Sequence, residues 1–218
     1  MKYYNILSLV FVFVLSVNRL YADDKNISIG LFSSGDISSW ESKSFSGITH
    51  YQITEIDNTF SLQAKSHASA SGLFIEQRID LNKTPYLNWS WRINQHLNNL
   101  NEQSKSGDDF SARIYIVVSG GWAFWRTKAI NYVWAGNTAK GFIWPNAFVG
   151  KKSMMVALRS HDDKTQVWYQ EKRNIQMDFK QIFGSDIQYI DGIALMTDTD
   201  NSQSHALAYY GDIYFSAE

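Results

Sequence analysis

Oxygen-bearing side chains are concentrated in LMTDTDNS, residues 195–202, directly after an apolar run. Asp198, Asp200 and Ser202 occupy alternate positions, which resembles the first half of a calcium-binding EF-hand loop. The resemblance ends there, because glutamine and tyrosine replace the glycine and glutamate that such a loop needs at its sixth and twelfth positions. Three interpretations stay open: a hydrogen-bonded Asx-type turn, direct ligand contact, or a calcium site completed by acids of other loops.

A second polar stretch, SGDDFSAR at residues 106–113, places Asp109, Ser111 and Arg113 on one side of an expected strand. Asp109 and Arg113 either pair with each other in a salt bridge or stand exposed on a concave sheet face. In the second case they bind vicinal hydroxyls or a carboxylate of a ligand, since a guanidinium forms paired hydrogen bonds with such groups. Arg92 has the same outward orientation on its own strand and is a candidate neighbour.

Four tryptophans lie in or beside glycine-rich segments that are expected to be loops: Trp122, Trp125, Trp134 and Trp144. A tryptophan in a loop either caps the core or offers a flat surface on which a sugar ring stacks. Core capping is the commoner role for any one of them, but we do not expect all four to be buried.

No residue set typical of catalysis can be assembled from this sequence. The chain has no cysteine, no HExxH or GxSxG motif and no phosphate-binding glycine loop, and its five histidines are scattered. Glu171 and Asp109 would serve glycoside hydrolysis only if their carboxyl groups lay ~5–9 Å apart. Pairing of Glu171 with Lys172 or Arg173 explains the same residue. We therefore favour a binding protein over an enzyme.

The elements that must position these residues are β-strands. In YLNWSWRI (86–93) and SARIYIVV (111–118) apolar and other residues alternate, which predicts one buried and one solvent-facing side. One short helix is expected at QMDFKQIFG, ended by Gly184. Further strands are expected at residues 49–56, 60–66, 72–80, 129–134, 154–158, 166–173, 188–197 and 206–215.

Closely spaced strands without alternating long helices predict a mainly β fold. We expect a two-sheet antiparallel β-sandwich, jelly-roll-like, with at most one or two short helices; a closed barrel is the alternative. No repeat or linker divides the chain, so residues 23–218 are expected to form a single domain.

The first 22 residues have the layout of a secretory signal peptide. One lysine precedes an uncharged apolar run from Ile6 to Val17, which is too short to span ~30 Å of hydrocarbon as a helix. Cleavage is expected after Ala22, with an uncleaved N-terminal anchor as the alternative. The chain is therefore expected to be periplasmic or secreted, with no transmembrane segment after cleavage.

Charge excludes one class of partner. Removal of Lys2 and Arg19 with the leader leaves 18 of the 20 basic residues against 21 acidic ones, a net charge of −3. Nucleic-acid binding needs a concentrated basic surface, which this balance does not supply. The composition does not indicate an oligomeric state.

Several blocks together resemble the family called DUF3047, exported bacterial proteins of unknown function. The resemblance brings no substrate, cofactor or catalytic residue with it. The closing pattern is also similar to the last two strands of galactose-binding-like jelly rolls, a group rich in carbohydrate-binding modules. The blocks are KSHASASGL (65–73), LNWSWRI (87–93), KSGDDFSARIYIVV (105–118), AINYVWA (129–135), EKRN (171–174), DFKQIFG (178–184), IALMTDTDNS (193–202) and AYYGDIYF (208–215).

These observations predict a non-catalytic domain that binds a polar small molecule or a glycan. A carbohydrate-active hydrolase or lyase on the same scaffold is the alternative, followed by an envelope structural or adaptor protein. No cofactor is expected, apart from the calcium interpretation of Asp198 and Asp200. The expected ligand contacts are Arg92, Asp108, Asp109, Arg113, Trp122, Trp125, Asn131, Trp134, Asp198, Asp200 and Asn201.

Overall fold

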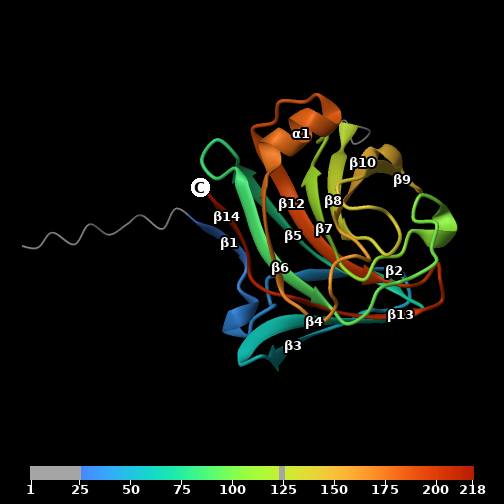
Figure 1. Ribbon diagram of the computed structural model, residues 1–218. Helices are drawn as coiled ribbons and strands as arrows, with labels where there is room; N and C mark the ends of the chain where they lie inside the picture. Colours follow the sequence, from blue (N-terminus) through green and yellow to red (C-terminus); the bar gives the residue numbers. More distant parts are fainter. Residues whose placement is uncertain (1–25, 123–125) are drawn as a thin grey trace, which may run out of the picture.

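The computed structural model describes residues 26–122 and 126–218 (Figure 1). The expected signal peptide, residues 1–22, and Trp125 lie outside the described residues, so both stay predictions.

Two seven-stranded sheets packed face to face confirm the expected mainly β sandwich (Figure 1). The paired strands are antiparallel except for β8 and β10, which run parallel. Sheet A contains β1 (Ile27–Gly30), β3 (His50–Ile56), β4 (Thr59–His67), β6 (Tyr86–Ile93), β11 (Tyr169–Asn174), β13 (His205–Tyr210) and β14 (Ile213–Ser216). Sheet B contains β2 (Glu41–Ser46), β5 (Ala70–Asp80), β7 (Arg113–Val118), β8 (Lys128–Trp134), β9 (Ile143–Asn146), β10 (Gly150–Arg159) and β12 (Tyr189–Asp198).

Alternate residues of β6 supply the centre of the core. Leu87, Trp89, Trp91 and Ile93 are buried, as the alternation predicts. Trp91 packs against Trp134 of sheet B, with ring centroids 5.9 Å apart. Each fully buried large apolar side chain stabilises the fold by about 1.5–3 kcal/mol, so this layer of aromatic rings holds the two sheets together.

The last expected strand, 206–215, is interrupted at Gly211, between β13 and β14. The Gly211 N–H donates to the Ser90 carbonyl at 2.9 Å, and a Cβ on Gly211 would lie 2.1 Å from Ser90 Oγ, so a larger residue here would require the Ser90 hydroxyl to move. Past this break β14 pairs with β1, whereas β4 pairs with β13 from Leu62 onward. Residues 59–61 of β4 therefore pair, among the described strands, with β3 alone.

A second, smaller apolar cluster lies on the outer face of sheet B. Phe110, from the segment between β6 and β7, packs there with Val133, Trp144 and Met155. In the same segment Glu102 is buried, and its carboxylate accepts hydrogen bonds from the N–H groups that directly follow β8. The outer face of sheet B is therefore covered at this end, whereas the alternation in residues 111–118 predicts a solvent-facing side.

The helical segments are α1 (Ile175–Phe183) and two single turns, η1 (Phe32–Ser34) and η2 (Lys105–Gly107). The α1 helix begins at Asn174, whose side chain accepts a hydrogen bond from the Met177 N–H at 3.0 Å, and it ends at Gly184 in the left-handed region. Figure 1 places α1 at one end of the sandwich. Within the described ranges, no helix has the length and apolar character to cross a membrane.

Candidate functional site

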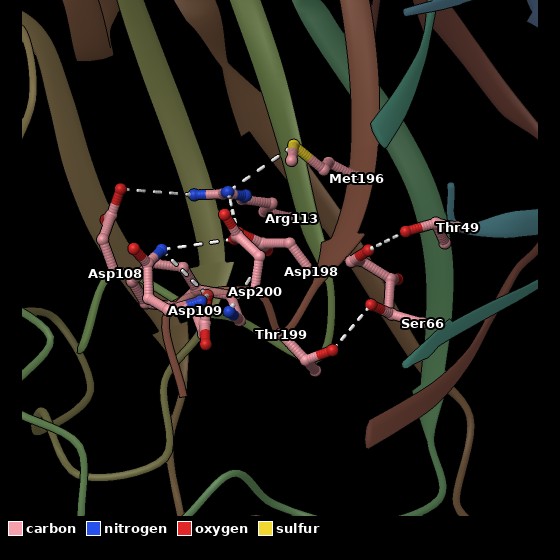
Figure 2. A network of polar contacts seen from close by, with 12 residues as sticks. Thr49, Ser66, Asp108, Asp109, Arg113, Met196, Asp198, Thr199 and Asp200 are labelled. Carbon is pink, nitrogen blue, oxygen red and sulfur yellow. Dashed lines mark hydrogen bonds and ion pairs between the residues drawn. The ribbon is translucent and has the colours of Figure 1, made fainter. Parts of the chain in front are cut away.

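Most of the polar residues predicted from the sequence come together near one end of sheet B. Asp108 and Asp109 precede β7, Arg113 begins it, and Asp198 and Asp200 lie at the end of the neighbouring strand β12. Figure 2 shows these acidic side chains gathered near the Arg113 guanidinium. We call Asp108, Asp109, Arg113, Asp198 and Asp200 the acidic network.

Arg113 is the centre of the acidic network. Its guanidinium donates to Asp198 and lies 3.9 Å from Asp108 Oδ2. The rings of Phe110 and Tyr115 flank it, with centroids 5.3 and 5.4 Å away. Arg113 therefore pairs with Asp198 and Asp108, rather than with Asp109 as one interpretation of the sequence proposed.

Asp109 holds two loops together. Its carboxylate accepts hydrogen bonds from the backbone N–H and the side-chain amide of Asn201, and from the N–H of Ser202. The turn after β12 is thereby fixed to the segment before β7. Of the three interpretations of residues 195–202, the hydrogen-bonded turn fits this pattern of contacts.

The network is buried, which limits what it can do. Arg113 is 4% exposed, and Asp108, Asp109 and Asp198 are equally inaccessible. Burial raises the pKa of Asp198 well above its usual range, against the opposing effect of Arg113, and burial also raises the pKa of Asp108 and Asp200. A ligand could not reach Asp108, Asp109, Arg113 or Asp198 while the covering loops stay in place, whereas Asp200 is only partly buried.

The residues do not fit a calcium ion well. One oxygen from each of Asp109, Asp198 and Asp200 lies within 4.8 Å of the others, which is close enough for a shared cation. The oxygens of Asp109 and Asp198, however, already accept from backbone N–H groups, and Arg113 supplies the local positive charge. Calcium needs six to eight free oxygen ligands, so the acidic network functions better as a structural unit.

The other predicted contacts lie elsewhere. Trp134 is in the main core, and Asn131 is buried beside Ser153, to which its amide donates. Trp122 is fully exposed at the turn after β7. Arg92 faces outward from sheet A, on the opposite side of the sandwich from the acidic network. Trp134 and Asn131 are therefore unsuited to ligand contact, and Arg92 is not the expected neighbour of Arg113.

The proposed catalytic pair is also separated. Glu171 accepts hydrogen bonds from Trp91 Nε1 at 3.0 Å and from Arg159 Nε at 2.6 Å, within sheet A and the core. Asp109 belongs to the acidic network beside sheet B. The prediction that Glu171 pairs with Lys172 or Arg173 is also wrong, since Arg159 is its partner.

An open cavity of about 780 Å³ lies on the outer face of sheet A, and we call it the sheet-A cavity. Trp168 and Tyr214 contribute aromatic rings, and neither is fully buried. Phe60 and Glu171 also line the cavity, but the register turns their side chains toward the inner face of sheet A. The other polar residues of the wall are Ser33, Asp57, Thr59, Ser61, Asn88, Ser90, Gln170, Lys172 and Asp212.

The tip of the β3–β4 hairpin forms one wall of this cavity. Asp57 and Asn58 both have positive φ, which gives the tight turn that joins the strands. The Asp57 carboxylate accepts from Arg92 Nη1 at 3.1 Å and from Trp168 Nε1 at 3.2 Å. These two hydrogen bonds fix the hairpin tip to β6 and to the segment before β11, and they orient the Trp168 ring.

None of the expected ligand contacts in the described residues lines the sheet-A cavity; Arg92 only donates to Asp57 at its edge. The walls of the cavity come from five separate segments, around residues 33, 57–61, 88–90, 168–172 and 211–214, which only the sheet pairing brings together. One signal was available, because the polar side of YLNWSWRI contains Asn88, Ser90 and Arg92.

Comparison with solved structures shows where this architecture occurs. The family 30 carbohydrate-binding module of a cellulosomal cellulase from Clostridium thermocellum matches 88% of this chain and 98% of its own, with a TM-score of 0.51 and 9% identity. The family 11 carbohydrate-binding module from Clostridium thermocellum, in complex with a β-1,3-1,4-mixed-linked tetrasaccharide, matches 88% of this chain and 95% of its own, with a TM-score of 0.46 and 10% identity. At such identities the first likeness shows the fold alone, which is the jelly-roll-like sandwich expected from the sequence.

No curated protein matches the sequence. The family model described as "Protein of unknown function (DUF3047)" matches residues 38–214, which is most of the chain and includes the acidic network and all the residues that line the sheet-A cavity except Ser33. This chain therefore belongs to the DUF3047 family.

Proposed function

We propose that this protein is a non-catalytic glycan-binding domain whose ligand lies in the sheet-A cavity. The observation that carries the proposal is the composition of that cavity, in which the incompletely buried rings of Trp168 and Tyr214 stand among hydroxyl, amide and charged side chains. Aromatic rings pack against the apolar faces of sugar rings, while hydroxyls and amides hydrogen-bond the sugar's own hydroxyls. A volume of about 780 Å³ is in the range of sites for ligands of several rings.

A binding role explains how the carboxylates of the cavity are held. Asp57 accepts from Arg92 and Trp168, Glu171 from Trp91 and Arg159, and Asp212 from the N–H and hydroxyl of Ser33. Each is fixed by donors of the protein itself. This favours a rigid, preformed surface, on which a ligand loses little affinity to reorganisation.

The alternative is a glycoside hydrolase or lyase, and the observation that favours it is that the acidic residues Asp57, Glu171 and Asp212 all lie at one cavity. Release of reducing ends or unsaturated products from a polysaccharide, abolished by Glu171→Gln, would support that alternative.

The binding proposal is tested by retention of the protein on a panel of insoluble and gel-embedded polysaccharides. We expect Trp168→Ala to abolish retention, because it removes the ring and the anchor of the hairpin tip. Trp122→Ala is the matched control, since Trp122 is fully exposed outside the cavity, and it should leave retention unchanged. Absence of retention on every polysaccharide, with a folded protein, would refute the proposal.

We also propose that the chain is exported and acts in the periplasm or outside the cell. The signal-peptide layout of residues 1–22 supports this. The proposed ligand, a glycan, is also a molecule that cells display at their surfaces. Mass spectrometry of protein recovered from the periplasm or medium should find Asp23 at the N-terminus. Recovery of the intact chain only from the cytoplasm would contradict it.

A further inference from the structure

A second depression, of about 800 Å³, lies at the other end of sheet A. The side chains that line it include His50 from β3, Lys65 and His67 from β4, and His205 from β13. We call it the histidine depression. Three of the chain's five histidines gather there, although they are far apart in sequence.

The strand register brings the imidazoles close together. His67 and His205 are directly opposite in the β4–β13 pair, and the next N–H along β4, of Ala68, donates to the carbonyl of Ser204 at 2.9 Å. That pattern makes His67 and His205 a non-hydrogen-bonded pair, the type in which cross-strand side chains stand closest. His50 is opposite Lys65 in the β3–β4 pair, so it is a diagonal neighbour of His67.

The described residues that line the histidine depression include four basic side chains and no carboxylate. The others are Ile48, Ser66, Asn94, Gln95, Ala206 and Leu207. Imidazole and ammonium N–H groups donate hydrogen bonds to anions. Exposed Lys65 stands between the imidazoles, which disfavours a divalent metal ion at the same place and favours an anion.

The sheet-A cavity and the histidine depression are both lined by residues on the same face of strand β4. Thr59 and Ser61 of β4 line the sheet-A cavity, Lys65 and His67 line the histidine depression, and these odd-numbered residues project from the same face. Gln63 lies between them and donates to the Tyr209 hydroxyl at 3.4 Å. From Ser61 to His67 the strand rises about 20 Å, which is longer than one sugar ring.

We propose that the ligand is an acidic oligosaccharide lying along β4, with sugar rings in the sheet-A cavity and an anionic group in the histidine depression. This inference rests on the proposed glycan-binding function and adds the charge and the minimum length of the ligand. The anionic group is a uronate carboxylate or a sulfate, which present the same chemistry to imidazolium and ammonium donors.

The test is titration calorimetry of the full mature chain with four probes: oligogalacturonate, its neutral methyl ester, chondroitin sulfate oligosaccharide and a neutral cello-oligosaccharide. We expect at least one acidic probe to bind about tenfold more tightly than the neutral probes, the effect of one charge-assisted hydrogen bond. The advantage should weaken as salt is added, because salt screens the attraction between the anionic group and the basic side chains. Preference for galacturonate or for chondroitin sulfate identifies the anionic group.

Matched variants separate this inference from the proposed function. His67→Ala with His205→Ala should remove the preference for acidic probes and its salt dependence but keep the binding of neutral ones. Lys151→Ala, an exposed charge on β10, is the control and should change neither. Equal binding of acidic and neutral probes, with loss of both in Trp168→Ala, would overturn the inference and leave the proposed function standing. Binding of zinc at pH 7.5 that is lost in His67→Ala, with no preference for acidic probes, would also overturn it.

Discussion

The burial of one guanidinium among several carboxyl groups is the strongest electrostatic feature at the scale of single residues. Arg113 and Asp198 are almost inaccessible to solvent, and each is the other's direct partner. Removing one member of a buried pair leaves the other charge without compensation, which costs far more than the pair itself contributes.

We therefore predict that Arg113→Met lowers the free energy of unfolding by about 3–5 kcal/mol. The double variant Arg113→Met with Asp198→Asn should lose less than the single variant, because the direct partner of Arg113 is then no longer left as an uncompensated charge. Urea unfolding followed by circular dichroism measures both. A single variant within about 1 kcal/mol of the parent would show that water reaches the network.

The same network makes a prediction about pH. Burial raises the pKa of Asp108, and the carboxylates of Asp109 and Asp200 add to the effect. An acid whose pKa is higher in the folded than in the unfolded state stabilises the fold below its unfolded pKa, about 3.9 for aspartate. That contribution is lost as the pH rises through the folded pKa.

Asp108→Asn should therefore reduce the loss of stability between about pH 4 and neutrality, and should raise the melting temperature at pH 7. An asparagine at this position still offers a carbonyl oxygen to the Asn146 amide, which donates to Asp108 at 3.0 Å. Melting curves across the pH range measure the difference between variant and parent. Asp186→Asn, an exposed carboxyl group, is the control. Identical pH profiles for Asp108→Asn and the parent would contradict the assignment.

At the scale of elements, the β3–β4 hairpin decides whether the sheet-A cavity keeps its shape. The turn depends on the positive φ of Asp57 and Asn58, and its position depends on the two hydrogen bonds that Asp57 accepts. The side chain of Asp57 is mostly exposed, so its ion pair with Arg92 contributes little to overall stability.

We predict that Asp57→Gly lowers glycan affinity about tenfold while it lowers stability by less than about 1 kcal/mol. Glycine accepts the φ of 54° at this position, so the change removes the anchor without straining the turn. Asp57→Asn, which keeps an acceptor for Trp168, should retain most of the affinity. Calorimetry together with urea unfolding gives both quantities, and unchanged affinity in Asp57→Gly would show that the anchor is not needed.

The sequence predicted individual strands and the helix better than it predicted which side chains pair across the sheets. The alternation from Leu87 to Ile93 correctly predicted a core strand, and Gly184 correctly marked the end of the helix. The sequence pattern missed β2, whose residues are all exposed, and β9, which has only four residues. Neither strand shows an alternation of buried and exposed residues. The partner of Arg113 was also missed, because Asp198 is 85 residues away and only the β7–β12 register brings the two together.

At the scale of the whole molecule, the main core and the small cluster around Phe110 either unfold together or separately. We propose that residues 23–218 form one domain, because single strands contribute to both clusters. In β8, Tyr132 and Trp134 face the main core, while Val133 between them faces the small cluster with Phe110. Loss of β8 would therefore disrupt the packing of both clusters.

One cooperative transition is therefore expected in urea, with far-ultraviolet circular dichroism and tryptophan fluorescence changing at the same midpoint. Trp144 reports on the small cluster and Trp91 on the main core, so Trp144→Phe should lower the fluorescence change without separating the two midpoints. Hydrogen exchange gives an independent measure, because Val133 and Tyr132 should exchange through the same global opening. Two separated transitions, with the small cluster lost first, would instead show that the segment between β6 and β7 opens independently and exposes the acidic network to ligands.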